Sequence, residues 1–230
     1  AFATIILEYF SNVMITLQSF LRRFSAMFLI LSVLLISGCG GSDTIPDATT
    51  EGPFATFLKD IELFNLTDPI AIVETDQGTF AIELYKTHMP NSVTRFTELA
   101  LAQRYDGSKV YNAVNNFAVY MGDKSGSGTE ASDVKPLVLE THPDITHATE
   151  GMVGFVHQSG AQCVSSTNKA QCSQDALNSA KTFFYITLAP APSLDNSYAV
   201  FGKVVKGLQI VKNLRKGNRI QKVTIVERAK

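Results

Sequence analysis

Apolar and polar residues alternate in several short stretches of this chain. Residues 69–85, PIAIVETDQGTFAIELY, hold two such stretches around residues 75–78, which predicts a β-hairpin. Residues 89–104, MPNSVTRFTELALAQR, change to helical spacing with a proline near the start, which predicts a helix. Further strands are predicted at 151–158, 182–188, 198–205 and 220–227, and a short helix at 206–217. Many short strands and few helices favour a closed antiparallel barrel or a sandwich.

One long β-prone stretch, residues 108–123 (SKVYNAVNNFAVYMGD), lacks any acid or base in its middle. Between Tyr111 and Tyr120 the only polar side chains are Asn112, Asn115 and Asn116. Extended structure is predicted on both sides of an interruption at Asn115–Asn116. In contrast, residues 159–181 show no apolar rhythm and are expected to form a long excursion from the sheet.

The N-terminal region has the pattern of a secretory signal. Arg22 and Arg23 precede an apolar run over residues 26–36, and small residues follow. We therefore expect residues 1–38 to be a signal peptide; an uncleaved membrane anchor and a buried core helix are the alternatives. The first residue is an alanine and Met14 is a natural beginning, so residues 1–13 are interpreted as a fragment or a mis-called start.

The end of this region, LLISGCGGSD, resembles the lipobox of bacterial lipoproteins. That resemblance implies that Cys39 is lipidated and becomes the mature N-terminus, and Gly40 after it favours the outer membrane. Residues 39–52 are small and polar and are expected to form a flexible tether. A single domain is predicted over residues 53–230. The localisation expected from this pattern is the bacterial cell envelope, facing the periplasm.

Composition fits a globular domain, since 45% of the 230 residues are hydrophobic and 18% are charged. The formal net charge of -1 excludes a typical nucleic-acid-binding protein. A small basic cluster is interpreted as solvated surface; it consists of Lys212, Arg215, Lys216 and Arg219. Cys163 and Cys172 form either a disulfide or two free thiols, and their spacing does not fit a zinc site. No serine-hydrolase elbow or phosphate-binding loop is present.

Several segments together resemble the cyclophilin family of peptidyl-prolyl cis-trans isomerases, in its bacterial lipoprotein form. They are VETDQGTFAIELY, PNSVTRFTELA, YDG and NSAKTFFYITLAPAPSLDNSYAVFGKVVKGLQIV, in family order over residues 70–228. The resemblance implies a mainly β fold, a closed eight-stranded antiparallel barrel capped by two α-helices. It also implies isomerisation of prolyl peptide bonds, hence protein folding assistance (rotamase activity), with no metal or organic cofactor.

In the family, a strand arginine donates toward the prolyl nitrogen, and the strand reads FHRVIPGFMIQGGD. In this chain Asn112 stands at the arginine position, so the resemblance implies a degenerate active site. A neutral donor is weaker than a charged one, and we expect reduced activity. His157 is a possible substitute donor, as is Lys181, or each has an ordinary structural role.

The resemblance also implies a substrate-binding groove, in which Asn112, Ala118 and Tyr120 share strand parity. Its residues are Phe117, Ala118, Tyr120, Val156, Gln158, Tyr185, Leu194 and Tyr198. The expected partners are proline-containing segments of envelope proteins. The protein is expected to contact the membrane through its N-terminal lipid, to be a monomer and not to bind nucleic acid. A catalytically inactive prolyl-peptide-binding or envelope-assembly lipoprotein is the alternative to a weak isomerase.

Overall fold

The computed structural model describes residues 54–59, 61–65, 67–129, 133–158 and 169–227, except for the side chains of Lys169 and Cys172. The chain divides into two units, residues 1–44 and 45–230, and all described residues belong to the second. The predicted signal peptide, Cys39, the tether and Cys163 lie outside the described residues, as does the start of the predicted domain at Pro53.

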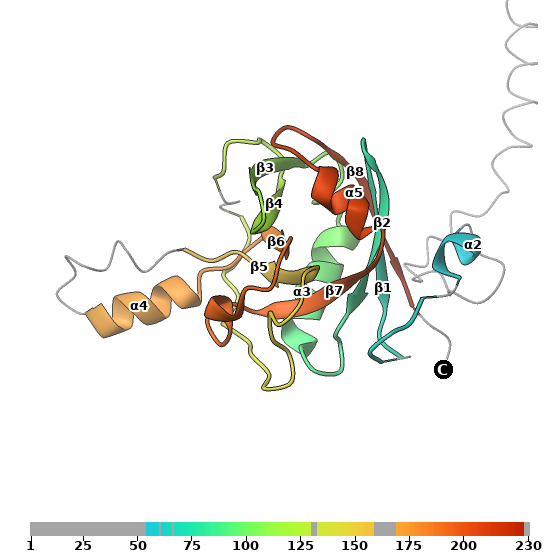
Figure 1. Ribbon diagram of the computed structural model, residues 1–230. Helices are drawn as coiled ribbons and strands as arrows, with labels where there is room; N and C mark the ends of the chain where they lie inside the picture. The colour runs from blue at the N-terminus through green and yellow to red at the C-terminus, as the bar shows by residue number, and fades with distance from the viewer. Residues whose placement is uncertain (1–53, 60, 66, 130–132, 159–168, 228–230) are drawn as a thin grey trace, which may run out of the picture. The chain divides into compact units, whose positions relative to one another are not determined.

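Eight antiparallel strands form one curved sheet (Figure 1) in the order β3-β4-β6-β5-β7-β2-β1-β8. The strands are β1 (Ile70–Thr75), β2 (Gly78–Leu84), β3 (Lys109–Val114), β4 (Ala118–Asp123), β5 (Met152–Phe155), β6 (Phe184–Thr187), β7 (Val200–Lys206) and β8 (Ile220–Val226). The predicted hairpin is confirmed: Thr75 pairs with Gly78 at the β1–β2 turn. Every predicted strand has a counterpart, although β5 and β6 are shorter than expected.

The prediction of a closed barrel was wrong, because the sheet is an open half-barrel whose edges are β3 and β8. One bridge, Lys109 to Arg219, links the two edges, and the Val110 amide donates to the Asn218 carbonyl at 2.8 Å. β3 has a register shift on each side of Val110, and the chain before β8 turns there. Ile220, the first residue of β8, also exchanges backbone hydrogen bonds with Gly107 and Ser108, each at 2.8 Å. The edges therefore pair only over residues 107–110 and 217–220.

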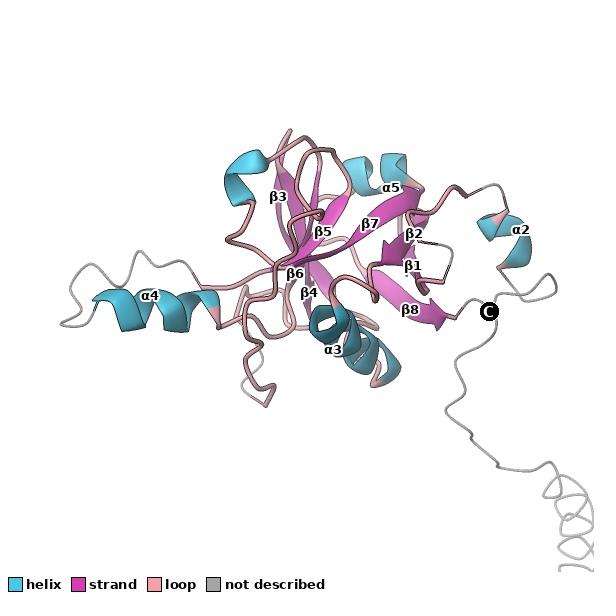
Figure 2. Ribbon diagram, turned by 90° about the horizontal axis from the view of Figure 1, so that it is seen from below, coloured by secondary structure: helices cyan, strands magenta, loops and turns pink. Residues whose placement is uncertain are grey.

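Four helices occur among the described residues, rather than the two that were predicted. They are α2 (Ala55–Leu58), α3 (Pro90–Leu101), α4 (Lys169–Leu177) and α5 (Leu208–Asn213), with a 3-10 turn at Pro192–Leu194. α3 and α5 lie at opposite ends of the curved sheet (Figures 1 and 2), pack on the same core and correspond to the predicted helices. α4 falls in the stretch predicted to be irregular, where Ala, Gln and Leu favour a helix even without an apolar face.

The helix α3 begins at a proline, which suits the first helical position because its missing N–H has no intrahelical acceptor there. Its next two amides, of Asn91 and Ser92, donate to the Glu140 carboxylate at 3.1 and 2.7 Å. This carboxylate lies 48 residues away along the chain and replaces a local cap. It thereby fixes the start of α3 against the loop after β4.

The main core lies between α3 and the concave face of the sheet. Phe96 on α3 stacks on Tyr105 at a centroid distance of 4.9 Å and meets Phe184 edge-on at 5.4 Å. Phe184 is fully buried, as expected for a core aromatic. A second, smaller cluster covers the other face of β1 and β2, where Phe57 and Leu58 of α2 pack against Ile70 and Ile72. Residues before β1 thus belong to the folded domain.

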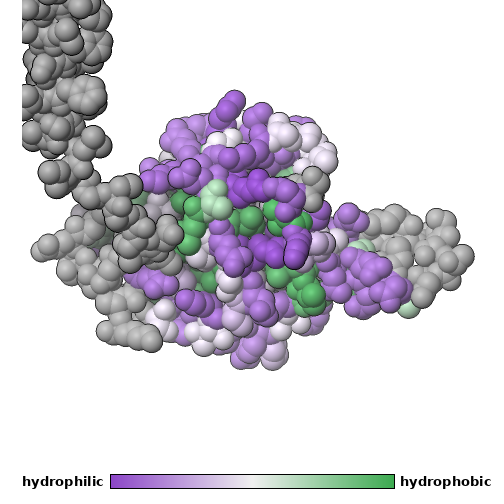
Figure 3. Space-filling view, turned by 180° about the vertical axis from the view of Figure 1, so that it is seen from behind, coloured by the Kyte–Doolittle hydropathy of each residue, from purple (hydrophilic) through white to green (hydrophobic). Residues whose placement is uncertain are grey.

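The rest of the described surface carries few large apolar side chains. Figure 3 shows one face, on which apolar patches are interspersed with hydrophilic side chains. Among the described residues, the large hydrophobic side chains that are exposed are Phe64, Leu101, Val114 and Val138. Val114 is of interest because it lies on the same strand face as Asn112. Among the described residues, none of the helices has the length and apolarity required to cross a bilayer.

Candidate prolyl-peptide site

A row of paired residues crosses the convex face of strands β3, β4, β6 and β5. Asn112 pairs with Tyr120, Tyr120 with Tyr185, and Tyr185 with Gly154. The next row, Ala113, Val119, Ile186 and Val153, packs into the main core. Since side chains alternate along a strand, Asn112, Tyr120 and Tyr185 lie on the face opposite the core. The predicted shared face of Asn112, Ala118 and Tyr120 agrees with this register, because Ala118 pairs with Val114.

The turn before β4 keeps this row in place. Asn116 has a positive φ of 56°, a conformation that asparagine tolerates better than most residues other than glycine. The Phe117 amide donates to the Val114 carbonyl at 3.1 Å and closes the turn. The Asn115–Asn116 pair can therefore stand where the family strand has Pro-Gly and still connect the two strands.

Aromatic rings cover the face around Asn112. The Tyr111 ring lies 4.7 Å from that of Phe183 and 6.0 Å from that of Tyr120. The Tyr185 ring lies 6.2 Å from Tyr120 and meets Tyr198 edge-on at 5.7 Å. Tyr185 is only 2% exposed, so it forms the base of the cluster, whereas Tyr120 and Tyr198 are half-buried. The residue paired with Tyr185 on β5 is Gly154, and a glycine is needed there because a Cβ would collide with the Tyr185 ring.

The Tyr185 hydroxyl belongs to a buried hydrogen-bond chain. His147 Nε2 lies 2.7 Å from the Tyr185 hydroxyl, and His147 Nδ1 lies 2.6 Å from Asp195 Oδ1. Burial lowers the pKa of His147, although the bond to Asp195 opposes the shift, and burial raises the pKa of Tyr185 well above its usual value. With a neutral ring and an ionised carboxylate, Nδ1–H donates to Asp195 and the tyrosine O–H donates to Nε2.

Sequence reasoning missed His147, although Asp195 lies in the quoted SLDN motif. A histidine in a loop shows no periodicity that would mark it as buried. The signal that exists is chemical, since a tyrosine at a position where the family has a phenylalanine needs a partner for its hydroxyl when buried.

His157, the predicted substitute donor, is held by the protein itself. Its two ring nitrogens lie 2.7 Å from the Gln158 carbonyl oxygen and 2.8 Å from the Ser197 carbonyl oxygen. The ring also stacks on Tyr198 at 4.2 Å. This geometry makes His157 a support of the aromatic cluster, and its donor role stays a prediction. Lys181 is half-buried and also has a partner in the protein.

Asn112 and Tyr120 differ from these residues in hydrogen bonding. Within the described part of the chain, neither the Asn112 amide nor the Tyr120 hydroxyl has a hydrogen-bond partner. Burial, together with Tyr198, raises the pKa of Tyr120, so its hydroxyl keeps its proton at neutral pH. Two neutral donors therefore lie next to each other, paired across β3 and β4.

The other predicted groove residues surround this pair with differing exposure. Phe117, Val156 and Leu194 are half-buried, Gln158 is exposed, and Ala118 is fully buried. Ala118 therefore offers no surface to a ligand in this conformation. The backbone N–H of Gln158 donates to the Ser179 hydroxyl at 2.7 Å, and this bond connects the segment after β5 to the segment before β6. Their roles in binding stay predictions.

The fold matches the cyclophilin class in comparisons with known structures. A cyclophilin-type isomerase from Cryptosporidium parvum has a TM-score of 0.58 at 19% identity, covering 69% of this chain and 97% of that structure. The cyclophilin AquaCyp293 from Hirschia baltica has a TM-score of 0.55 at 16% identity, covering 70% of this chain and 74% of that one. At these identities the similarity shows the fold alone.

The family follows from the sequence comparisons. The model of the cyclophilin type peptidyl-prolyl cis-trans isomerase family matches residues 70–230, and the chain belongs to this family of enzymes. Peptidyl-prolyl cis-trans isomerase-like 1 of Neurospora crassa is 32% identical over 144 residues, 62% of this chain and 78% of that protein. The Arabidopsis thaliana isomerase CYP18-2 is 30% identical over 148 residues, 64% of this chain and 80% of that protein.

Proposed function

We propose that this chain is a slow prolyl isomerase that binds its substrate over the Asn112–Tyr120–Tyr185 row. One observation carries the proposal: the Asn112 amide and the Tyr120 hydroxyl, two neutral donors, pair across β3 and β4 and have no partner among the described residues. The sequence resemblance implies that Asn112 stands at the position of the family's arginine. A structure of the Cryptosporidium parvum relative was determined in the presence of the dipeptide Ala-Pro. The family membership, together with that complex, supports a proline-containing segment as the ligand of this face.

The chemistry needs no covalent step. Rotation about a peptide bond has a barrier of about 18–20 kcal/mol, which arises from amide resonance. A donor near the prolyl nitrogen favours the twisted amide, whose nitrogen lone pair is freed, over both planar forms. Asn112 and Tyr120 supply neutral donors, whereas charged donors form bonds roughly twice as strong. We expect a rate about 10²-fold below that of a site with the arginine.

The aromatic cluster would bind the substrate rather than act on the amide. Tyr198, held by the stacked His157 ring, provides a flat apolar surface beside Tyr185, and the half-buried Phe117 provides another at the turn between β3 and β4. Aromatic surfaces of this kind suit extended proline-containing segments, which lose little conformational entropy on binding. The apolar Val114, which is 41% exposed on the same face, extends this surface toward the turn.

Line-shape or exchange NMR on an Ala-Pro-containing peptide tests this function. Faster cis–trans exchange with the protein, together with chemical-shift changes at Asn112 and Tyr120, supports the isomerase. The same shifts without faster exchange would instead support the alternative, a prolyl-peptide-binding or envelope-assembly protein without catalysis. That alternative is favoured by the lack of a charged side chain in the row. A peptide with alanine in place of proline is the control.

We further propose that the chain acts on envelope proteins as a monomer, anchored through lipid on Cys39, with Cys163 and Cys172 bonded to each other. The double arginine, the apolar run and the LLISGCGGSD sequence support the anchor. Mass spectrometry of the native protein tests it: an acylated Cys39 at the N-terminus is expected. Cys39→Ala should move the protein out of the membrane fraction, whereas Cys163→Ala should not. Thiol labelling without reductant tests the disulfide.

A further inference from the structure

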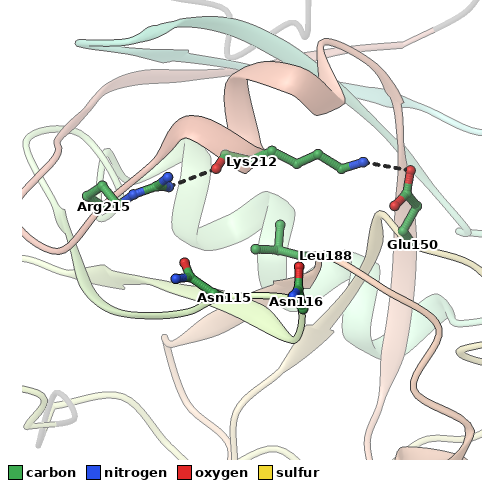
Figure 4. Close-up of a pocket in the computed structure, with 6 residues that line it drawn as sticks. All are labelled: Asn115, Asn116, Glu150, Leu188, Lys212 and Arg215. Atoms are coloured by element: carbon green, nitrogen blue, oxygen red, sulfur yellow. Dashed lines mark hydrogen bonds and ion pairs between the residues drawn. The ribbon is translucent and has the colours of Figure 1, made fainter.

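A polar pocket of about 510 Å³ lies at the turn between β3 and β4, beyond the aromatic cluster. Asn115 and Asn116 of the turn form one side and Lys212 and Arg215 the other, with Leu188 between them (Figure 4). Glu150 closes one end. The turn joins the two strands that carry Asn112 and Tyr120, so the pocket and the prolyl site are built on the same hairpin.

The two basic side chains of the pocket are fixed by contacts within the protein. Lys212 Nζ lies 2.9 Å from Glu150 Oε1, and Arg215 Nη1 donates to the carbonyls of Lys212 and Leu214, each at 2.8 Å. These bonds use one nitrogen of the guanidinium, and its other N–H groups have no partner among the described residues. A planar guanidinium held in this way is suited to bind a carboxylate.

The opposite side of the pocket offers neutral donors. In the described part of the chain, the side-chain amides of Asn115 and Asn116 have no hydrogen-bond partner. With two cations and one carboxylate, the lining carries a formal charge of +1. A singly charged anion balances this charge. The exposed Lys216 and Arg219, in the same basic cluster, add to the positive field.

We propose that this pocket binds an acidic side chain of the client polypeptide and makes the protein selective for prolyl segments with a nearby Asp or Glu. The inference rests on the proposed function, because the client reaches the pocket from the prolyl site. Asn115 is three residues beyond Asn112, about 10 Å along the strand at ~3.3 Å per residue. An extended client chain spans that distance in three or four residues.

Titrations of the full chain with three peptides test the inference. The first contains Ala-Pro with a glutamate three or four residues from the proline, in versions with the acid before and after it. The second has glutamine in place of the glutamate, and the third has the glutamate but no proline. The glutamate peptide, in one of its two versions, should bind about fivefold more tightly than the glutamine peptide at low salt. Equal affinity would overturn the proposal.

Variants separate the pocket from the rest of the basic cluster. Arg215→Gln should reduce the ratio of the affinities for the glutamate and glutamine peptides to near one. Lys216→Gln changes a residue outside the pocket and should retain most of the preference for glutamate. Equal losses in both variants would show a diffuse charge effect and overturn the proposal. Because Arg215 also holds the end of α5, Asn115→Ala is a second variant, and it should weaken the preference with no structural bond lost.

The proline-free peptide distinguishes failure of this inference from failure of the proposed function. Shifts of the Asn115 and Asn116 side-chain amides with this peptide support the pocket, even if no peptide shows catalysed exchange. Isomerisation of the glutamine peptide with no response to glutamate in any peptide would retain the proposed function and refute the pocket. If a free C-terminal carboxylate is the actual ligand, amidating the peptide ends will abolish the shifts, which also overturns the side-chain proposal.

Discussion

Asn112 and Tyr120 are direct cross-strand partners on the convex side of β3 and β4. Their Cβ atoms are thus expected to lie about 4.5–5.5 Å apart, close enough for both side chains to contact one substrate group. Within the described residues each lacks a hydrogen-bond partner, whereas the adjacent Tyr185 hydroxyl is bound to His147. The contrast supports the proposal that this pair donates to a ligand.

Removing the Tyr120 hydroxyl tests its part in this pair. Tyr120→Phe keeps the ring and its packing, and should lower the catalysed exchange rate about tenfold, because a neutral hydrogen bond contributes about 1–1.5 kcal/mol. The rate is measured by NMR exchange on an Ala-Pro peptide at equal saturation. Thr94→Ala, on the exposed side of α3, is the control. An unchanged rate in Tyr120→Phe would remove the hydroxyl from the mechanism.

His147 should make the stability of the domain depend on pH. Burial lowers its pKa in the folded state below the value of about 6.5 in the unfolded chain, so the unfolded state binds more protons. Its stabilising contribution is complete above about pH 6.5 and is lost as pH falls toward the lower folded pKa. Urea unfolding at pH 8 and pH 5 measures the loss. His147→Gln should lose less stability between pH 8 and pH 5 than the unmodified protein, because the buried histidine is gone. Some loss can remain from the other three histidines. An equal loss in both proteins would contradict the assignment to His147.

Gly154 provides the space for the Tyr185 ring. A Cβ at this position would overlap the ring, so Gly154→Ala should destabilise the domain by about 1–3 kcal/mol. The cause is testable with a double-mutant cycle measured by chemical denaturation. In Tyr185→Ala the ring is gone, and the added methyl should then cost much less. If the two costs simply add, the collision with Tyr185 is not the reason for the glycine.

The segment before β1 should stabilise the domain. Phe57 packs on the second apolar cluster, and Lys206 Nζ lies 5.0 Å from the centre of its ring. Phe57→Ala should lower the free energy of unfolding by about 1–2 kcal/mol, less than for a fully buried phenylalanine. The neighbouring Thr56 is exposed, so Thr56→Ala should change it by less than about 0.5 kcal/mol. Similar values for both would place the segment outside the cooperative unit.

Much of the sheet could be predicted from the sequence because the strands show local patterns of apolar residues. The hairpin around Thr75–Gly78 and the helix from Pro90 are set by local patterns, and both were found. Closure of the sheet was not predictable in this way. It depends on how far β3 pairs with the chain before β8, which the register shifts beside Val110 limit. Likewise, α4 has no apolar stripe that would have indicated it.

The positions of the candidate site residues on the sheet were predicted where strand parity determines them. They were missed where contacts between distant segments determine them. The shared face of Asn112 and Tyr120 follows from a period of two, provided that the bulge falls at Tyr111. The burial of Ala118 and the contact of His157 Nε2 with the Ser197 carbonyl depend on neighbours from distant segments. The His147–Asp195 bond joins residues 48 apart, and no local pattern marks it.

The proposed function requires that this face accept a prolyl segment and that it lack only the positive charge of the family's arginine. Asn112→Arg, assayed by catalysed cis–trans exchange on an Ala-Pro peptide, tests it most directly. Gln77→Arg, which adds the same charge at the exposed β1–β2 turn, is the matched control. We expect a rate increase of about 10²-fold for Asn112→Arg and no change for the control. Binding of the peptide elsewhere, or no gain in rate from the arginine, would contradict it.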